Sequence, residues 1–191
     1  MSLVSGFAEV EITPPLGTRK MGWIKEIVGD HVLDPLFARV GILESGGISL
    51  AFVQLDLCMI RGTDTRILRQ AVEARFGFPG ANIMVACTHN HAGPAMRDGI
   101  TYLREAGYVE RLHALLLSAF AQALETRQAA ELGFASVTET RVSHNRRIVR
   151  ARDRGGQYGW GRNHSIRGLI GKRVGDGLSG CQRLNSQRCV V

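Results

Sequence analysis

Apolar and acidic residues alternate over residues 7–12 of the chain, which read FAEVEI. Strict alternation places one side of a strand on a core and the other in solvent, so a half-buried β-strand is predicted here. Residues 37–43 and 48–57 predict two further strands, which an ESGG turn joins into a hairpin. The second of these strands is apolar over a long run, and we expect it to be buried on both faces.

Helical spacing of apolar residues follows the third strand. Thr63 is predicted to cap this helix, Asp64 suits its first turn, and Gly77 is predicted to end it. Residues 82–87 then predict a short apolar strand. The longest helix is predicted over residues 108–127, where leucines and alanines form one apolar face.

A last strand is predicted at residues 131–137, which gives the order strand, strand, strand, helix, strand, helix, strand. Such an order favours the α/β class, with a mixed β-sheet and packed helices in a single domain. We assign that domain to residues 1–147. Residues 148–191 form an irregular basic tail, rich in arginine and glycine, which we expect to be disordered or to depart from the pattern of the domain.

The net charge of +7 at pH 7 divides unevenly along the chain. Residues 146–191 hold eleven lysines and arginines against two aspartates, so their charge is +9. Residues 1–145 hold the remaining thirteen basic and fifteen acidic residues, so their charge is −2. The basic character therefore belongs to the tail, and the body of the chain is nearly neutral.

The composition, with 45% hydrophobic and 21% charged residues, is that of a globular protein. No run approaches the roughly 18 apolar residues that a transmembrane segment needs, and the first residues lack the features of a secretory signal. The four cysteines fall at irregular spacings; Cys58 and Cys87 lie in apolar runs, whereas Cys181 and Cys189 lie in the tail. We expect the first two to be buried free thiols, which favours a reducing, cytoplasmic location.

Two histidines, His89 and His91, lie in the sequence THNHAGP directly after the strand predicted at residues 82–87. On an extended backbone, side chains at positions i and i+2 point to the same side, so the pair can reach one metal, or one metal and one substrate group. Neutral imidazole suits zinc, which usually takes three protein ligands and a water in a catalytic site. The plainer alternative is a loop whose histidines hydrogen-bond nearby carbonyls.

Several segments of the chain resemble the neutral (neutral/alkaline), non-lysosomal ceramidase family, in the order that the family has them. The resemblance covers about residues 7–147 and indicates the amino-terminal part of the catalytic domain. In the histidine segment, alanine stands here where the family has serine. The five segments are AEVEITPPLG at residues 8–17, LDPLFAR at 33–39, QLDL at 54–57, THNHAGP at 88–94 and VSHNRR at 142–147.

This resemblance implies a zinc-dependent amide hydrolase that cleaves N-acyl-sphingosine, a ceramide-like lipid amide, into a fatty acid and a sphingoid base. His89 matches the family's zinc ligand, His91 its substrate-contacting histidine, and Arg146 an arginine that lines its site. His91 and Arg146 are therefore the catalytic candidates, because such groups stabilise the developing oxyanion. Asp56 follows a strand and either orients a ligand or caps a loop.

The chain also departs from the family, whose members use a second zinc histidine, a glutamate and a tyrosine further along. His164 is the only histidine after Arg147, and its surroundings do not resemble the family's second metal-ligand segment. We therefore expect a truncation or frameshift after about residue 150, and weak or no hydrolysis by the chain alone. Members of the family are often secreted or membrane-associated.

Two other functions are compatible with the sequence. The basic tail would bind anions or nucleic acid in a salt-dependent manner, but Tyr158 and Trp160 are its only aromatic residues, so no specific nucleic-acid partner is expected. A structural module without catalysis is the third possibility. The sequence does not indicate an oligomeric state, although an incomplete domain would expose core surface and favour self-association.

Overall fold

The computed structural model divides the chain into two units, residues 1–132 and 133–191, and each is described by itself. The tail predicted over residues 148–191 falls mostly outside the described residues. The structure describes residues 2–138, 147–149, 160–162 and 188–190.

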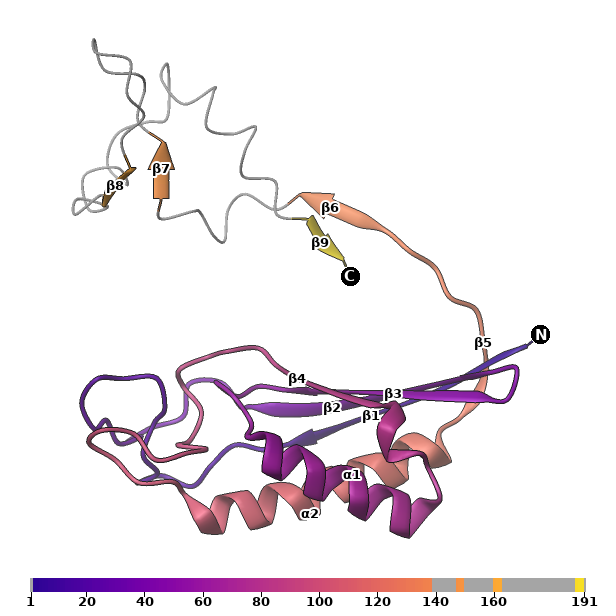
Figure 1. Cartoon of the computed structure of the whole chain (residues 1–191), viewed down its shortest axis with the longest axis horizontal. Coiled ribbons are helices and arrows are strands. Elements are labelled where there is room, and N and C mark those ends of the chain that lie inside the picture. The colour runs from indigo at the N-terminus through magenta and orange to yellow at the C-terminus, as the bar shows by residue number, and fades with distance from the viewer. Residues whose placement is uncertain (1, 139–146, 150–159, 163–187, 191) are drawn as a thin grey trace. The chain divides into compact units, whose positions relative to one another are not determined.

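The first unit is built on a mixed five-stranded sheet with the order β4-β3-β2-β1-β5 (Figure 1). Strands β3 and β4 are parallel, and all other neighbours in this sheet are antiparallel. The α/β class predicted from the order of elements is confirmed. The strands are β1 (Leu3–Glu11), β2 (Phe37–Ser45), β3 (Ile48–Leu55), β4 (Ile83–Cys87) and β5 (Gln128–Ala130).

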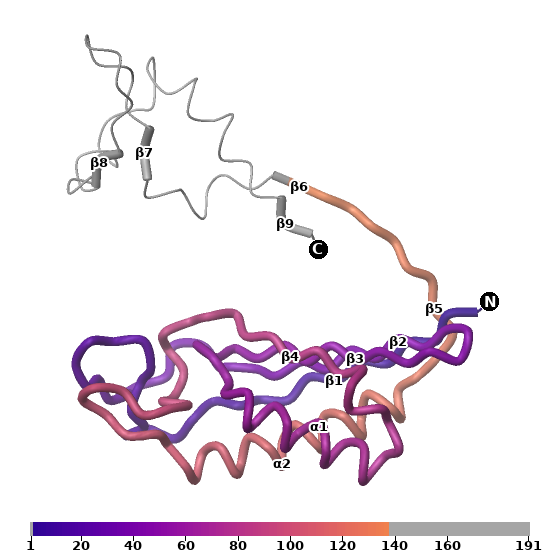
Figure 2. The backbone as a smooth tube through the Cα atoms, in the orientation of Figure 1, coloured from indigo at the N-terminus to yellow at the C-terminus, as the bar shows by residue number. Residues whose placement is uncertain are grey.

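Two helices, α1 (Gly62–Phe76) and α2 (Ala106–Glu125), cover the same face of this sheet (Figure 2). Helix α1 and the short 3₁₀ turn η1 (Gly80–Asn82) form the crossover that makes β3 and β4 parallel. No helix in the described part of the chain is long and apolar enough to cross a membrane. Between helices and sheet lies one core, whose largest fully buried side chains include Phe120, Ile12, Ile42, Leu55, Leu68 and Leu112.

The ends of α1 agree only partly with the sequence prediction. Gly77 ends the helix as expected, in the left-handed conformation at φ 66°, and its N–H donates to the Glu73 carbonyl at 3.0 Å. The predicted cap was wrong, since Arg61 is the N-cap and Thr63 lies inside the helix. Asp64 lies in the first turn as predicted, but its side chain is buried.

The outer face of the sheet carries apolar side chains that the described residues of the first unit leave exposed. They include Phe7, Leu50, Phe52 and Met84, with exposed fractions between 42% and 65%. Burial of β3 on both faces was therefore a wrong prediction, because α1 and α2 both cover the inner face. The alternate residues of β3, such as Val53, are buried as expected.

The strand predicted at residues 131–137 was also wrong in its bounds. The chain adds β5 to the edge of β1 at residues 128–130 and then forms β6 (Ser136–Thr138) in the second unit. Within that unit the described strands pair antiparallel. The pairs are β6 with β9 (Arg188–Val190), and β7 (Arg147–Val149) with β8 (Trp160–Arg162).

Two long loops meet at the end of the sheet where β3 and β4 finish (Figure 1). The first connects β1 to β2, and the second connects β4 to α2. They are hydrogen-bonded to each other, from the Met21 N–H to the Gly93 carbonyl at 3.1 Å and from the Ala95 N–H to the Arg19 carbonyl at 2.8 Å. This pairing places the histidine segment against the first loop.

Candidate metal centre

The histidine segment leaves β4 at Cys87 and continues beside the chain that follows β3. The Thr88 N–H donates to the Leu55 carbonyl at 3.0 Å, and the His89 N–H donates to the Leu57 carbonyl at 3.0 Å. His89 then turns into the left-handed region at φ 62°, and it is the only non-glycine residue with a positive φ in the described part of the chain. Such a conformation is strained for a histidine, and strain of this kind concentrates at functional sites.

His89 and His91 come together as the sequence predicts, although the backbone between them is not extended. Their ring centroids lie 5.2 Å apart at an interplanar angle of 78°. Asn90 holds the turn, because its side-chain Oδ1 accepts hydrogen bonds from the N–H groups of Ala92 and Gly93, each at 3.1 Å. The predicted pairing of the rings is confirmed, but its geometric reason is the left-handed turn and not a continuous strand.

The tautomer of the neutral His89 ring follows from its hydrogen bond. Nδ1 lies 2.8 Å from the backbone carbonyl oxygen of Cys58. A carbonyl only accepts, so Nδ1 carries the proton and Nε2 keeps its lone pair. Histidines that bind metals commonly donate the other ring N–H in this way, which fixes the ring and its tautomer. His89 is therefore ready to bind a metal through Nε2.

Cys58 is the residue of this centre that the sequence prediction missed. One donor atom each from Cys58, His89 and His91 lie within 4.8 Å of one another. The sulfur of Cys58 is 3.8 Å from His89 Nδ1, and the residue is only 5% exposed. Burial raises the pKa of this thiol, and the positive charge of Arg97 acts in the opposite direction.

A signal for Cys58 was present in the order of elements. Cys58 follows β3 and the histidines follow β4, and the carboxyl ends of adjacent parallel strands meet at one edge of a sheet. The neighbouring Cys87 is also a free thiol, and burial raises its pKa to about 11. Cys87 does not belong to the metal-binding cluster of the described residues.

The loop that connects β1 to β2 packs against the imidazole of His91. Gly22, at φ 93°, lies so close to His91 that an added Cβ would be 2.4 Å from the ring nitrogen Nδ1. The adjacent Trp23 donates its indole N–H to the His91 carbonyl at 3.1 Å. A side chain at position 22 would therefore displace the His91 ring.

We expect Gly22→Ala to lower the affinity of the chain for zinc at least about tenfold, because it moves His91 away from His89. The positive φ should also reduce the free energy of unfolding by about 1–3 kcal/mol. Gly17→Ala is a matched control, since Gly17 has a similar φ of 86° but open space around its Cβ position. Zinc titration measures the affinity of both variants, and urea denaturation measures their stability. An equal loss of zinc affinity in the two variants would contradict the packing of Gly22 against His91.

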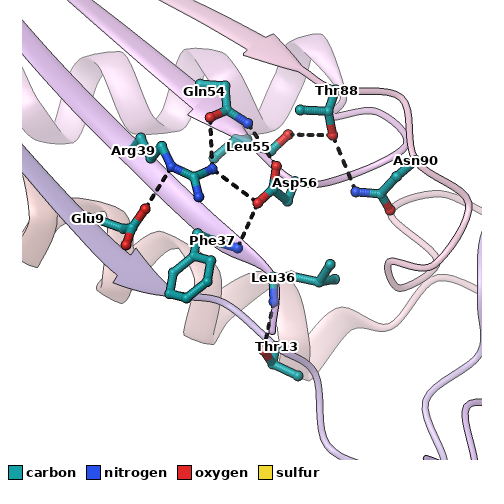
Figure 3. Close-up of polar contacts among 10 residues, drawn as sticks. All are labelled: Glu9, Thr13, Leu36, Phe37, Arg39, Gln54, Leu55, Asp56, Thr88 and Asn90. Carbon is teal, nitrogen blue, oxygen red and sulfur yellow. Dashed lines mark hydrogen bonds and ion pairs between the residues drawn. The ribbon is translucent and has the colours of Figure 1, made fainter. Parts of the chain in front are cut away.

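Asp56 acts as a cap for β2 and is not part of the histidine cluster (Figure 3). Its carboxylate accepts hydrogen bonds from the Phe37 N–H at 3.0 Å, from Gln54 at 2.8 Å and from Arg39 at 3.1 Å. Of the two roles that the sequence left open, the described contacts favour loop capping. Burial would raise the pKa of Asp56, but these hydrogen bonds and the charge of Arg39 together lower it.

The lowered pKa of Asp56 predicts how stability depends on pH. A carboxyl group with a lower pKa in the folded state stabilises it fully above the ordinary value of 3.8, and this contribution is lost as the pH falls through the lowered pKa. We expect Asp56→Asn to reduce the free energy of unfolding by about 1–2 kcal/mol at neutral pH. Urea denaturation from pH 7 downward should show this difference shrinking below the ordinary pKa, and a constant difference would contradict it.

A groove of about 340 Å³ adjoins the histidine segment on its other side. Its lining is mainly apolar and comes from the first loop, including Leu16 and Leu33, together with Asn90 and Ala92. Neither His89 nor His91 lines the groove, so it is separate from the histidine cluster. Arg146, the remaining catalytic candidate, lies outside the described residues.

No protein-family model matches the chain, and no curated protein matches it. Solved structures do match it. One is the crystal structure of neutral ceramidase from Pseudomonas aeruginosa, with a TM-score of 0.66 and 21% identity, covering 76% of this chain and 25% of that chain. Another is a ceramidase complexed with C2, with a TM-score of 0.63 and the same identity and coverage. The fold is ceramidase-like.

The ceramidase-like fold extends over most of this chain but only part of its structural relatives. The chain spans about a quarter of the length of the two ceramidases. A TM-score of 0.66 shows a shared fold, but at 21% identity the chemistry of the site has to be argued from the residues of this chain. Those residues are the thiol and the two imidazoles at the carboxyl ends of β3 and β4.

Proposed function

We propose that the chain carries the metal-binding part of a zinc-dependent amide hydrolase that acts on a ceramide-like lipid amide, N-acyl-sphingosine. The observation that carries the proposal is the cluster of Cys58, His89 and His91 at the carboxyl ends of parallel strands in a ceramidase-like fold. Ligand sites in open α/β sheets occupy this position. Its donor atoms are the sulfur and nitrogen that zinc prefers.

In this proposal His89 holds the metal through Nε2, and the Cys58 carbonyl fixes the ring through Nδ1. When bound, zinc supplies a Lewis acid for the amide carbonyl. His91, beside the metal position, contacts the substrate and stabilises negative charge that develops on the carbonyl oxygen. Arg146, as a second catalytic group, stabilises the same negative charge.

Exposed apolar side chains on the loops next to His91 support a lipid substrate. Trp23 contacts His91 and is 47% exposed, Ile24 is 92% exposed, and Ile100 is 98% exposed. The loops that carry Ile24 and Ile100 are joined by a hydrogen bond from the Thr101 hydroxyl to the Ile24 carbonyl at 3.3 Å. Exposed apolar residues gathered on neighbouring loops are typical of surfaces that bind lipid or another apolar partner.

We propose that the 191 residues by themselves have weak or no hydrolytic activity. The ceramidase resemblance calls for a second zinc histidine, a glutamate and a tyrosine, and no segment of this sequence matches them. Turnover of N-acyl-sphingosine at a rate comparable to that of a full-length ceramidase would contradict this proposal.

Binding of the lipid amide tests the proposal without requiring turnover. Trp160→Phe leaves Trp23 as the only tryptophan, and Trp23 contacts His91. We expect N-acyl-sphingosine in detergent micelles to change Trp23 fluorescence when zinc is present, and empty micelles to have no such effect. The additional change His89→Ala should remove the zinc dependence. If the lipid amide does not change the Trp23 fluorescence of the zinc-loaded chain, the proposed substrate class is wrong.

A further inference from the structure

We infer that Cys58 is a thiolate ligand of the metal ion that His89 holds, and that His91 supplies the third donor while no substrate is bound. The inference rests on the proposed function in one respect, the metal at His89. It goes beyond that function because the ceramidase resemblance gives no ligand role to this cysteine. It also means that the first unit of this chain can hold a metal with its own residues alone.

The donor atoms are near enough for side-chain movements to bring them around one ion. One donor atom from each of the three residues lies within 4.8 Å of the other two. In a tetrahedral zinc site with ordinary bond lengths, neighbouring donors are about 3.4–3.6 Å apart. Rotation of the His91 side chain, which is exposed, can provide the remaining contraction.

A hydrogen bond does not explain why the Cys58 thiol faces this ring. The Nδ1 proton of His89 is already donated to the Cys58 carbonyl at 2.8 Å, which is far shorter than the 3.8 Å to the sulfur. The thiol is buried and is a weak donor and acceptor in any case. A metal ion would explain why the sulfur of Cys58, a soft donor, lies beside two imidazoles at the end of a strand.

Metal binding at this centre converts the thiol to a thiolate. The S–H bond of Cys58 breaks, its proton passes to solvent, and a sulfur lone pair forms the bond to the metal. One thiolate and two neutral imidazoles leave a divalent ion with a net charge of +1 and a fourth position open. Such donors select zinc or cobalt over magnesium and calcium, which prefer oxygen.

Cobalt(II) substitution tests the sulfur ligand directly, because a thiolate bound to cobalt gives a charge-transfer absorption in the near ultraviolet that imidazole does not give. The full chain should carry the changes Cys181→Ser and Cys189→Ser, so that tail cysteines cannot contribute. We expect one cobalt per chain with both charge-transfer and d–d absorption. Cys58→Ser should abolish the charge-transfer band and weaken cobalt binding more than about 100-fold, beyond the loss typical of residues that only support a ligand. Cys87→Ser, the matched control, should change neither.

The outcomes separate this inference from the function on which it rests. Cobalt bound with d–d bands but without sulfur charge transfer would overturn the Cys58 ligand and leave the metal at His89 intact. No cobalt binding would overturn both. Because Cys58→Ser places a hydroxyl group at a buried position, Cys58→His serves as a second variant. It should restore cobalt binding without the sulfur band. A sulfur band that persists in either Cys58 variant would also overturn the assignment.

Discussion

Replacing His89 with alanine should lower the affinity of the chain for zinc by more than about 100-fold, since the substitution removes the ligand itself and not a group that supports it. His89 is the ring whose Nδ1 is fixed by a carbonyl, which leaves Nε2 to bind the metal. Calorimetric titration with zinc measures the loss. His31→Ala is the control, because His31 is exposed and pairs with Asp30, away from the cluster.

The same position tests the left-handed backbone independently of the metal. His89 has a φ of 62°, which glycine adopts at little cost and alanine does not. His89→Ala and His89→Gly both remove the imidazole, but only the glycine removes the strain of the positive φ at this position. We expect the glycine variant to unfold with a free energy about 1 kcal/mol above that of the alanine variant. Equal stabilities, or a more stable alanine variant, would contradict the left-handed turn.

Arg104→Met should reduce the free energy of unfolding by about 3–5 kcal/mol, the largest effect on stability that we expect from a single change. Arg104 forms an ion pair with Asp64 at 2.7 Å, and the Asp64 side chain is only 3% exposed. The second carboxylate oxygen of Asp64 has no hydrogen-bond partner among the described residues. Removing the arginine therefore leaves a buried charge with nothing to offset its desolvation.

Urea denaturation measures this loss, and a double variant controls for its cause. If the cost comes from the stranded carboxylate, Asp64→Asn together with Arg104→Met should recover much of the stability that Arg104→Met loses. The ion pair joins the loop before α2 to the first turn of α1, and Glu105 continues the connection by accepting a hydrogen bond from the Arg19 N–H at 3.0 Å. A loss below 1 kcal/mol for Arg104→Met would show that the pair does not hold these loops together.

Hydrophobic periodicity predicted most of the first unit, because its elements are amphipathic along their own length. Residues 108–127 have a leucine- and alanine-rich face that can be buried in only one way, and α2 lies there within two residues. The outer face of β3 shows the limit of such patterns. Leu50 and Phe52 resemble core residues in the sequence, but which face the helices cover depends on the connections between elements.

The candidate metal centre was also predictable only in part. The THNHAGP segment indicated His89 and His91, because both lie within one short loop. Cys58 is more than thirty positions away, and its contact with His89 exists only because α1 returns the chain so that β4 lies parallel to β3. Thr63 illustrates the opposite failure. It has a good capping side chain, but the chain leaves β3 through an extended Arg61, and the helix begins two residues too early for Thr63 to cap it.

X-ray absorption at the zinc edge of the zinc-loaded chain tests the metal centre most directly. With Cys181 and Cys189 replaced by serine, we predict one zinc per chain whose first shell holds two imidazole nitrogens at about 2.0–2.1 Å and one sulfur at about 2.3 Å. Multiple scattering from the imidazole rings should accompany the nitrogen shell and weaken in His89→Ala. A first shell of oxygen atoms alone, or a spectrum unchanged by His89→Ala, would contradict a metal centre at the ends of β3 and β4.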